Sequence, residues 1–183
     1  MRKIILESET SIETPLGELH FFVNTHAGDF SRLKMKCSEI IPTLPKGMSV
    51  EKCFVVIMQC KTTSPFKDIS FYCKWNNFNE RGYACSGEGL EAWEWDNGEH
   101  TVTIGTEDNE SLCSRIKINE LNNSNYYIEM KDNVTTINLT SFPEETELSL
   151  HFIIAWNPQP EPASDSCWFA VDQPHNNLLE QCN

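Results

Sequence analysis

The chain has 183 residues, enough for one ordinary domain with a substantial core, and its 10 Phe, 5 Trp and 4 Tyr argue against disorder. Its formal net charge of −13 disfavours nucleic acids and anionic membranes as partners, because both bind clustered Lys and Arg. Its longest apolar stretches have the length of a strand, well short of the roughly 18 to 20 residues of a membrane helix, so no membrane insertion is expected.

Strand-like alternation of apolar and polar residues recurs along the chain. It occurs at residues 19–23, 33–37, 69–75, 115–118, 126–130 and 148–156. Residues 54–58 are apolar at every position, which predicts a central strand that is buried on both faces.

Turn-forming residues separate these segments, and helical periodicity is nearly absent. Asp96, Asn97 and Gly98 form the strongest hairpin signal. Residues 175–181 can form one or two helical turns at the end of the chain, whereas the segment with the acidic residues Glu107, Asp108 and Glu110 is interpreted as a solvated loop.

Ten to twelve strands at regular spacing predict an all-β fold. We expect a two-sheet antiparallel β-sandwich or jelly roll, with a closed β-barrel as the alternative. No change in composition divides the chain, so residues 1–183 are predicted to form a single β-sandwich domain.

The eight cysteines indicate either disulfides or buried thiols. Residues 53–60 and 68–75 have the pattern of two strands with a short connection between them. In a hairpin of these strands Cys60 would lie roughly opposite Cys73, within the distance that a disulfide needs. Cys60 and Cys73 are therefore the candidate pair.

The cellular compartment is inferred from weaker signals. Four Asn-x-Ser/Thr sequons begin at Asn109, Asn122, Asn133 and Asn138, and with the cysteines they favour an extracellular protein. The N-terminal apolar stretch of three residues is too short for a signal peptide. The chain is then either a mature secreted protein with an added Met or a cytoplasmic protein, and we expect the former.

The most distinctive segment is residues 91–98, in which Trp93 and Trp95 share one strand face. Exposed indole rings could stack on sugars or anchor a protein partner, with Glu94, Asp96 and Asn97 as polar contacts. The alternative is that both rings fill the core. Catalysis by the acidic pair Glu94 and Asp96 is a weaker hypothesis.

No catalytic, nucleotide-binding or metal-binding motif occurs in the sequence, and the five histidines are scattered singly. We therefore predict no cofactor and no metal site. His151 is placed on the face of its strand opposite Leu150 and Phe152, which favours a packed or surface histidine over a catalytic base.

These observations favour a non-catalytic, secreted or surface-exposed binding module. Its ligand would be a glycan or another protein, for which the acidic surface favours a basic partner. The alternative is an intracellular β-sandwich that acts as a lectin-like or scaffold module, or less favourably as a small hydrolase. The sequence does not predict the oligomeric state.

Overall fold

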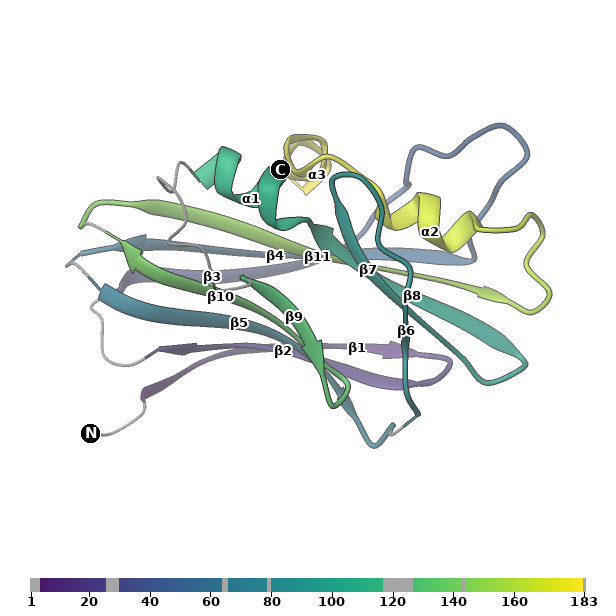
Figure 1. Ribbon diagram of the computed structural model, residues 1–183, viewed down its shortest axis with the longest axis horizontal. Helices are drawn as coiled ribbons and strands as arrows, with labels where there is room; N and C mark the ends of the chain where they lie inside the picture. Colours follow the sequence, from purple (N-terminus) through teal and green to yellow (C-terminus); the bar gives the residue numbers. More distant parts are fainter. Residues whose placement is uncertain are drawn as a thin grey trace.

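Two antiparallel sheets stack face to face in the computed structural model, which describes residues 4–25, 30–63, 66–78, 80–116, 127–142 and 144–182 (Figure 1). The five-stranded sheet has the order β1 (Ile4–Thr14), β2 (Gly17–Thr25), β5 (Phe66–Asn76), β10 (Val134–Phe142), β9 (Ile128–Lys131). The six-stranded sheet has the order β3 (Phe30–Glu39), β4 (Lys52–Thr62), β11 (Glu147–Pro158), β8 (His100–Glu107), β7 (Leu90–Asp96), β6 (Tyr83–Ala84). The predicted β-sandwich is confirmed, and the sheets do not close into a barrel.

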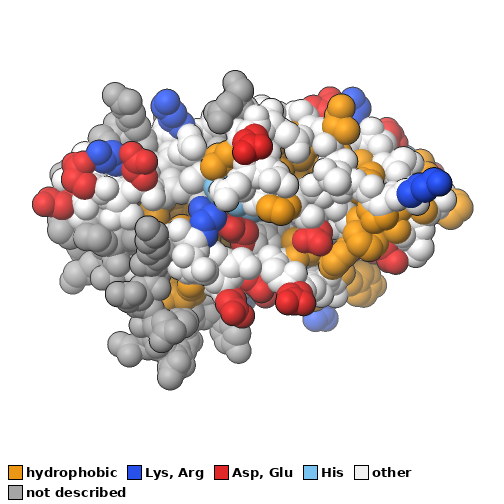
Figure 2. Space-filling view, turned by 90° about the horizontal axis from the view of Figure 1, so that it is seen from above, with side chains coloured by type: hydrophobic (Ala, Val, Ile, Leu, Met, Phe, Trp, Pro, Cys, Tyr) orange, Lys and Arg blue, Asp and Glu red, His pale blue; other side chains and the backbone are white. Residues whose placement is uncertain are grey.

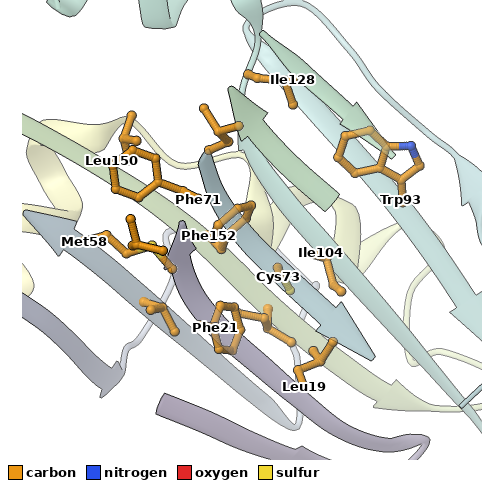
Figure 3. Packing of buried hydrophobic residues seen from close by; sticks show 14 of the residues in the cluster. Leu19, Phe21, Met58, Phe71, Cys73, Trp93, Ile104, Ile128, Leu150 and Phe152 are labelled. Atoms are coloured by element: carbon orange, nitrogen blue, oxygen red, sulfur yellow. The ribbon is translucent and has the colours of Figure 1, made fainter. Parts of the chain in front are cut away.

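The main core lies between the two sheets (Figure 3). Phe21 of β2 and Phe71 of β5 point from the five-stranded sheet toward Phe152 of β11, and the rings of Phe21 and Phe152 are 6.0 Å apart. These side chains come from alternate positions of their strands, as period-two alternation predicts. Burial of their apolar area is the main force that holds the two sheets together.

A second core cluster lies on the outer face of the six-stranded sheet. Val55 of β4 and Ile153 of β11 pack there against α2 (Ser166–Val171) and α3 (His175–Cys182). In Figure 1 α1 (Asn109–Ile116) lies on the same side of the molecule as these helices, but its buried residue Leu112 belongs to the core between the two sheets. The helical cover explains why residues 54–58 are apolar on both faces, and the predicted central position of this strand is confirmed, since β4 lies between β3 and β11.

The close approach of α2 to the sheet depends on a glycine. A Cβ atom at Gly105 of β8 would lie 2.8 Å from Cβ and Cγ2 of Val171 on α2. Real Cβ atoms do not approach other atoms so closely, so a larger residue at this position would force the helix away from the strand.

The hairpin predicted from residues 53–60 and 68–75 is wrong. Strand β4 pairs with β3 and β11, whereas β5 pairs with β2 and β10 in the other sheet. Cys60 and Cys73 are therefore on opposite sheets of the sandwich, and all eight cysteines are free thiols in the structure. A chain that crosses between sheets has the same alternation as a hairpin, because both place one apolar face of each strand in the core.

Helices account for the other differences from prediction. The helix expected near the C-terminus is confirmed as α3, but α1 replaces part of the loop expected at residues 107–110 and of the strand expected at 115–118. Asp108 accepts a hydrogen bond from the amide of Ser111 at 2.7 Å, which caps the start of α1. None of the described helices is both long and apolar enough to cross a membrane.

Candidate functional site

A pocket of about 430 Å³ opens on the helix-covered side of the molecule, between β8, β11, α1 and the segment that joins α2 to α3. Its lining includes polar side chains from all of these elements: Glu107, Ser114, Arg115, His151, Gln173 and His175. Figure 2 views this side, and a histidine side chain is visible there beside basic and acidic groups. The pocket lies where the helical cover of the six-stranded sheet is incomplete.

Two buried histidines form the base of this pocket. His151 is on the outer face of β11 and is 2% exposed, and His175 is the first residue of α3 and is 4% exposed. Their Nδ1 atoms are 2.8 Å apart, so one ring donates a hydrogen bond to the other. The Nε2 atom of His175 lies 3.1 Å from Oγ of Ser149, which shares the outer face of β11 with His151.

Both imidazoles are held in the neutral form. Burial and, to a smaller extent, the positive charge of Arg115 lower the pKa of His175 to about 4. The pKa of His151 is lowered well below its usual value, mainly by burial and then by His175 and Arg115. Removal from water disfavours an imidazolium, and no carboxylate accepts a hydrogen bond from either ring among the contacts of the described residues.

An ion pair stands beside the histidines. Arg115 of α1 donates from Nε to Oε1 of Glu107 at 2.7 Å and from Nη2 to Oε2 at 2.5 Å. This two-point contact is the strong geometry for a guanidinium and a carboxylate, and both side chains are largely buried. The cap at Asp108 fixes the start of α1 and thereby places Arg115 in the last turn over Glu107.

The far wall is held by Gln173, which joins α2 to the loop before β4. Its side chain accepts a hydrogen bond from the amide of Thr43 at 3.2 Å and donates to the carbonyl oxygens of Thr43 and Phe169 at 3.2 and 3.0 Å. These contacts hold the segment that leads into His175. The pocket therefore has well-positioned polar groups.

The structure places Trp93 and Trp95 in the core, at 6% and 2% exposed, so they do not form an exposed platform. The ring of Trp95 packs edge-on against Trp75 of the opposite sheet at 5.5 Å. Strand β7 ends in a turn, as expected, but the side of β7 that carries both indole rings points toward the other sheet.

The polar residues of the same segment have local structural roles. Asp96 and Asn97 accept hydrogen bonds from the amides of Gly98, Glu99 and His100, which stabilises the predicted turn between β7 and β8. Glu94 is half-buried on the outer face, where burial and the neighbouring Glu161 raise its pKa. None of these residues lines the pocket, and their proposed contact role stays a prediction.

Sequence reasoning missed the cluster of Glu107, Arg115, His151 and His175. The one available signal was a histidine on the second face of a strand whose first face is apolar. Its partners are 44, 36 and 24 positions away in the chain, so no local spacing could reveal them.

Comparison with known proteins adds little to this description. No protein-family model and no curated protein sequence matches the chain. Among solved structures, a putative kojibiose phosphorylase from the human microbiome is similar, with a TM-score of 0.36 and 9% identity. The match covers 96% of this chain and 21% of that chain, so this chain spans about a fifth of the other's length. A similarity at this level does not identify a function.

Proposed function

We propose that this protein is a non-catalytic glycan-binding module whose ligand binds in the pocket between β8, β11, α1 and the α2–α3 segment. The observation that carries the proposal is the pocket itself, a concave site of about 430 Å³ with polar groups that converge from four elements. Ligand sites of proteins have volumes of roughly 300 to 1,000 Å³ and a similar mixture of apolar walls and a few positioned polar groups.

The lining suits the hydroxyl groups of a sugar. A hydroxyl donates one hydrogen bond and accepts others, and it fits beside paired acceptors and donors such as Glu107 and Arg115. Each carboxylate oxygen of Glu107 retains a second lone pair beyond its contact with Arg115. Val171 and Pro174 add apolar wall for the C–H faces of a sugar ring.

The charge of the site favours a neutral ligand. Arg115 is already paired with Glu107, both histidines are neutral, and the whole chain carries a net charge of −13. An anionic sugar would meet this negative field without an unpaired cation among these pocket groups. We therefore expect neutral glycans to bind the metal-free protein better than sialylated or sulfated ones.

A glycan array tests this proposal, followed by calorimetry with the neutral glycans that it retains. Ser114 is exposed on α1 and lines the pocket, so Ser114→Phe should fill the site without disturbing the core. We expect this change to lower affinity at least about tenfold, which corresponds to about 1.4 kcal/mol. Glu110→Phe is the matched control, because Glu110 is exposed on the same helix but does not line the pocket.

Two results would contradict the proposal. One is that no neutral glycan binds to the folded wild-type protein. The other is that binding survives Ser114→Phe but is lost in Glu94→Gln or Asn97→Ala, which would move the site to the tip of β7.

A small hydrolase is the second candidate, because a chain of hydrogen bonds runs from Ser149 through His175 to His151. It has the order of a nucleophile, a base and an orienting group. Ser149, however, is not among the residues that line the pocket. Labelling of the protein by a fluorophosphonate, absent in Ser149→Ala, would favour this candidate over the binding module.

A further inference from the structure

We infer that Glu107, His151 and His175 bind one divalent transition-metal cation of the zinc class at the base of the pocket. The inference rests on the proposed function in that the same pocket is a binding site, but the cation needs no glycan in order to bind. Sequence motifs predicted no metal site, because the three residues come from β8, β11 and α3 and have no motif spacing.

The donor atoms are close enough to share one ion. One ligand atom from each of the three residues lies within 4.8 Å of the other two. Two nitrogens bound to the same tetrahedral Zn²⁺, at about 2.0 to 2.1 Å each, are about 3.3 Å apart. The Nδ1 atoms of His151 and His175 are 2.8 Å apart and share one proton, so binding of the ion separates them by about half an ångström and moves that proton to Nε2 of the ring that carried it.

The protonation of the histidines suits metal binding. A metal ligand must offer a lone pair, and the 2.8 Å hydrogen bond between the two Nδ1 atoms requires that one of them already offers one. When Nε2 of His175 donates to Oγ of Ser149, its Nδ1 atom carries the lone pair. Ser149 is thus a positioning residue of the kind that fixes the tautomer of a metal-bound histidine.

Arg115 affects the affinity of the site for the ion. Its two hydrogen bonds to Glu107 hold the carboxylate in place, as outer groups do for metal-bound carboxylates. Its positive charge lowers affinity for any cation, so we expect weaker binding than in a closed structural zinc site. Three protein ligands also leave a coordination position open toward the pocket, where water or a sugar hydroxyl can bind.

The donor set selects the kind of cation. Two imidazole nitrogens and one carboxylate suit Zn²⁺, Co²⁺ or Ni²⁺, whereas Ca²⁺ and Mg²⁺ prefer oxygen ligands. We therefore expect binding of Co²⁺ and Zn²⁺ and no competition from Ca²⁺ in excess.

The first test is a titration of the chelator-treated full chain with Co²⁺, monitored by visible absorption. The second is a titration with Zn²⁺ in competition with a chromophoric chelator. We expect one equivalent of metal and the bands of four- or five-coordinate Co²⁺ without thiolate charge-transfer absorption. Ser149→Ala should weaken binding about 10- to 100-fold, as loss of an outer-shell partner does, and His175→Gln should weaken it further.

Two further variants keep the test decisive. Glu107→Gln removes a ligand without changing a buried histidine, so it serves if circular dichroism shows that His175→Gln does not fold. His100→Gln is the matched control, because His100 begins the strand that ends at Glu107 and lies outside the three-residue cluster. It should leave the metal affinity unchanged.

The inference is wrong if the wild-type protein binds no Co²⁺ or Zn²⁺, or if His175→Gln and Glu107→Gln, when folded, bind them as tightly as the wild type does. Glycan binding by the chelator-treated protein separates the two proposals. If it persists while metal binding fails, only the metal site is wrong. If metal binds as expected and no glycan does, only the glycan function is wrong.

Discussion

The outer faces of the two sheets differ in polarity more than their inner faces do. On the six-stranded sheet the outer face has an apolar region that α2 and α3 cover, with Val55 and Ile153 buried beneath them. On the five-stranded sheet the outer face carries polar side chains such as His20, Ser70 and Lys74, which are partly or fully exposed. An apolar second face requires a cover, and the edge of that cover is where this protein forms its pocket.

The difference in burial between the two outer faces also affects the protonation of the histidines that lie on them. His20 lies 2.7 Å from Glu18 and 2.8 Å from Glu9, and its hydrogen bond to Glu18 is the main reason that its pKa is raised. The hydrogen bond from His20 is likewise the main cause that lowers the pKa of Glu18 to about 2. Among the residues that the structure describes, no carboxylate pairs with the buried His151 or His175, and the pKa values of both are lowered. Carboxylates stabilise the charged ring on one face, and burial stabilises the neutral ring on the other.

The largest expected effect is on the free energy of unfolding, and it is tested by one substitution on each outer face. Ile153→Ala removes a fully buried side chain beneath the helices, and we expect a loss of about 2 to 5 kcal/mol in the free energy of unfolding. Lys74→Ala on the exposed face should change it by no more than about 0.5 kcal/mol. Urea unfolding measures both values. Equal losses would show that the helices do not cover the six-stranded sheet in solution.

A pH titration of stability sharpens the comparison of the histidines. Because the folded pKa of His175 is lowered to about 4, its contribution is present above the unfolded value of 6.5 and is lost as the pH falls to about 4. We expect the metal-free wild type to lose about 2 to 3 kcal/mol more than His175→Gln does over this range. Urea unfolding at several pH values, with EDTA present, checks this difference. Parallel curves for the two proteins would contradict a buried neutral His175.

His20 should show the opposite sign. Its folded pKa is raised, so its small contribution is present below the unfolded value and is lost as the pH rises through the folded value.

The smallest expected effect is a change in the pKa of His20 alone. Glu18→Gln removes the partner that contributes most to the raised value, so the pKa of His20 should fall. An NMR titration of the histidine ring protons measures it, and the signals of His151 and His175 provide the internal control. A pKa of His20 that does not change would show that the contact with Glu18 is not populated in solution.

The sequence by itself determined the strands whose two faces have different and uniform surroundings. Alternation at residues 19–23 and 69–75 reports a core on one side and water on the other, so β2 and β5 were predictable, as was the turn at Asn97. The apolar residues 54–58 also revealed a strand with two buried faces. Such patterns are local, because each residue responds to the side of the strand on which it lies.

Tertiary structure alone decided the order of the strands, the burial of Trp93 and Trp95, and the pocket. Cys60 and Cys73 show why, since the same alternation fits a hairpin and a crossing between sheets. The indole rings could be assigned to the core only once the inner face of β7 was known. Glu107, Arg115, His151 and His175 meet because α1, α3, β8 and β11 all border one pocket, and contacts over such separations leave no periodic trace in the sequence.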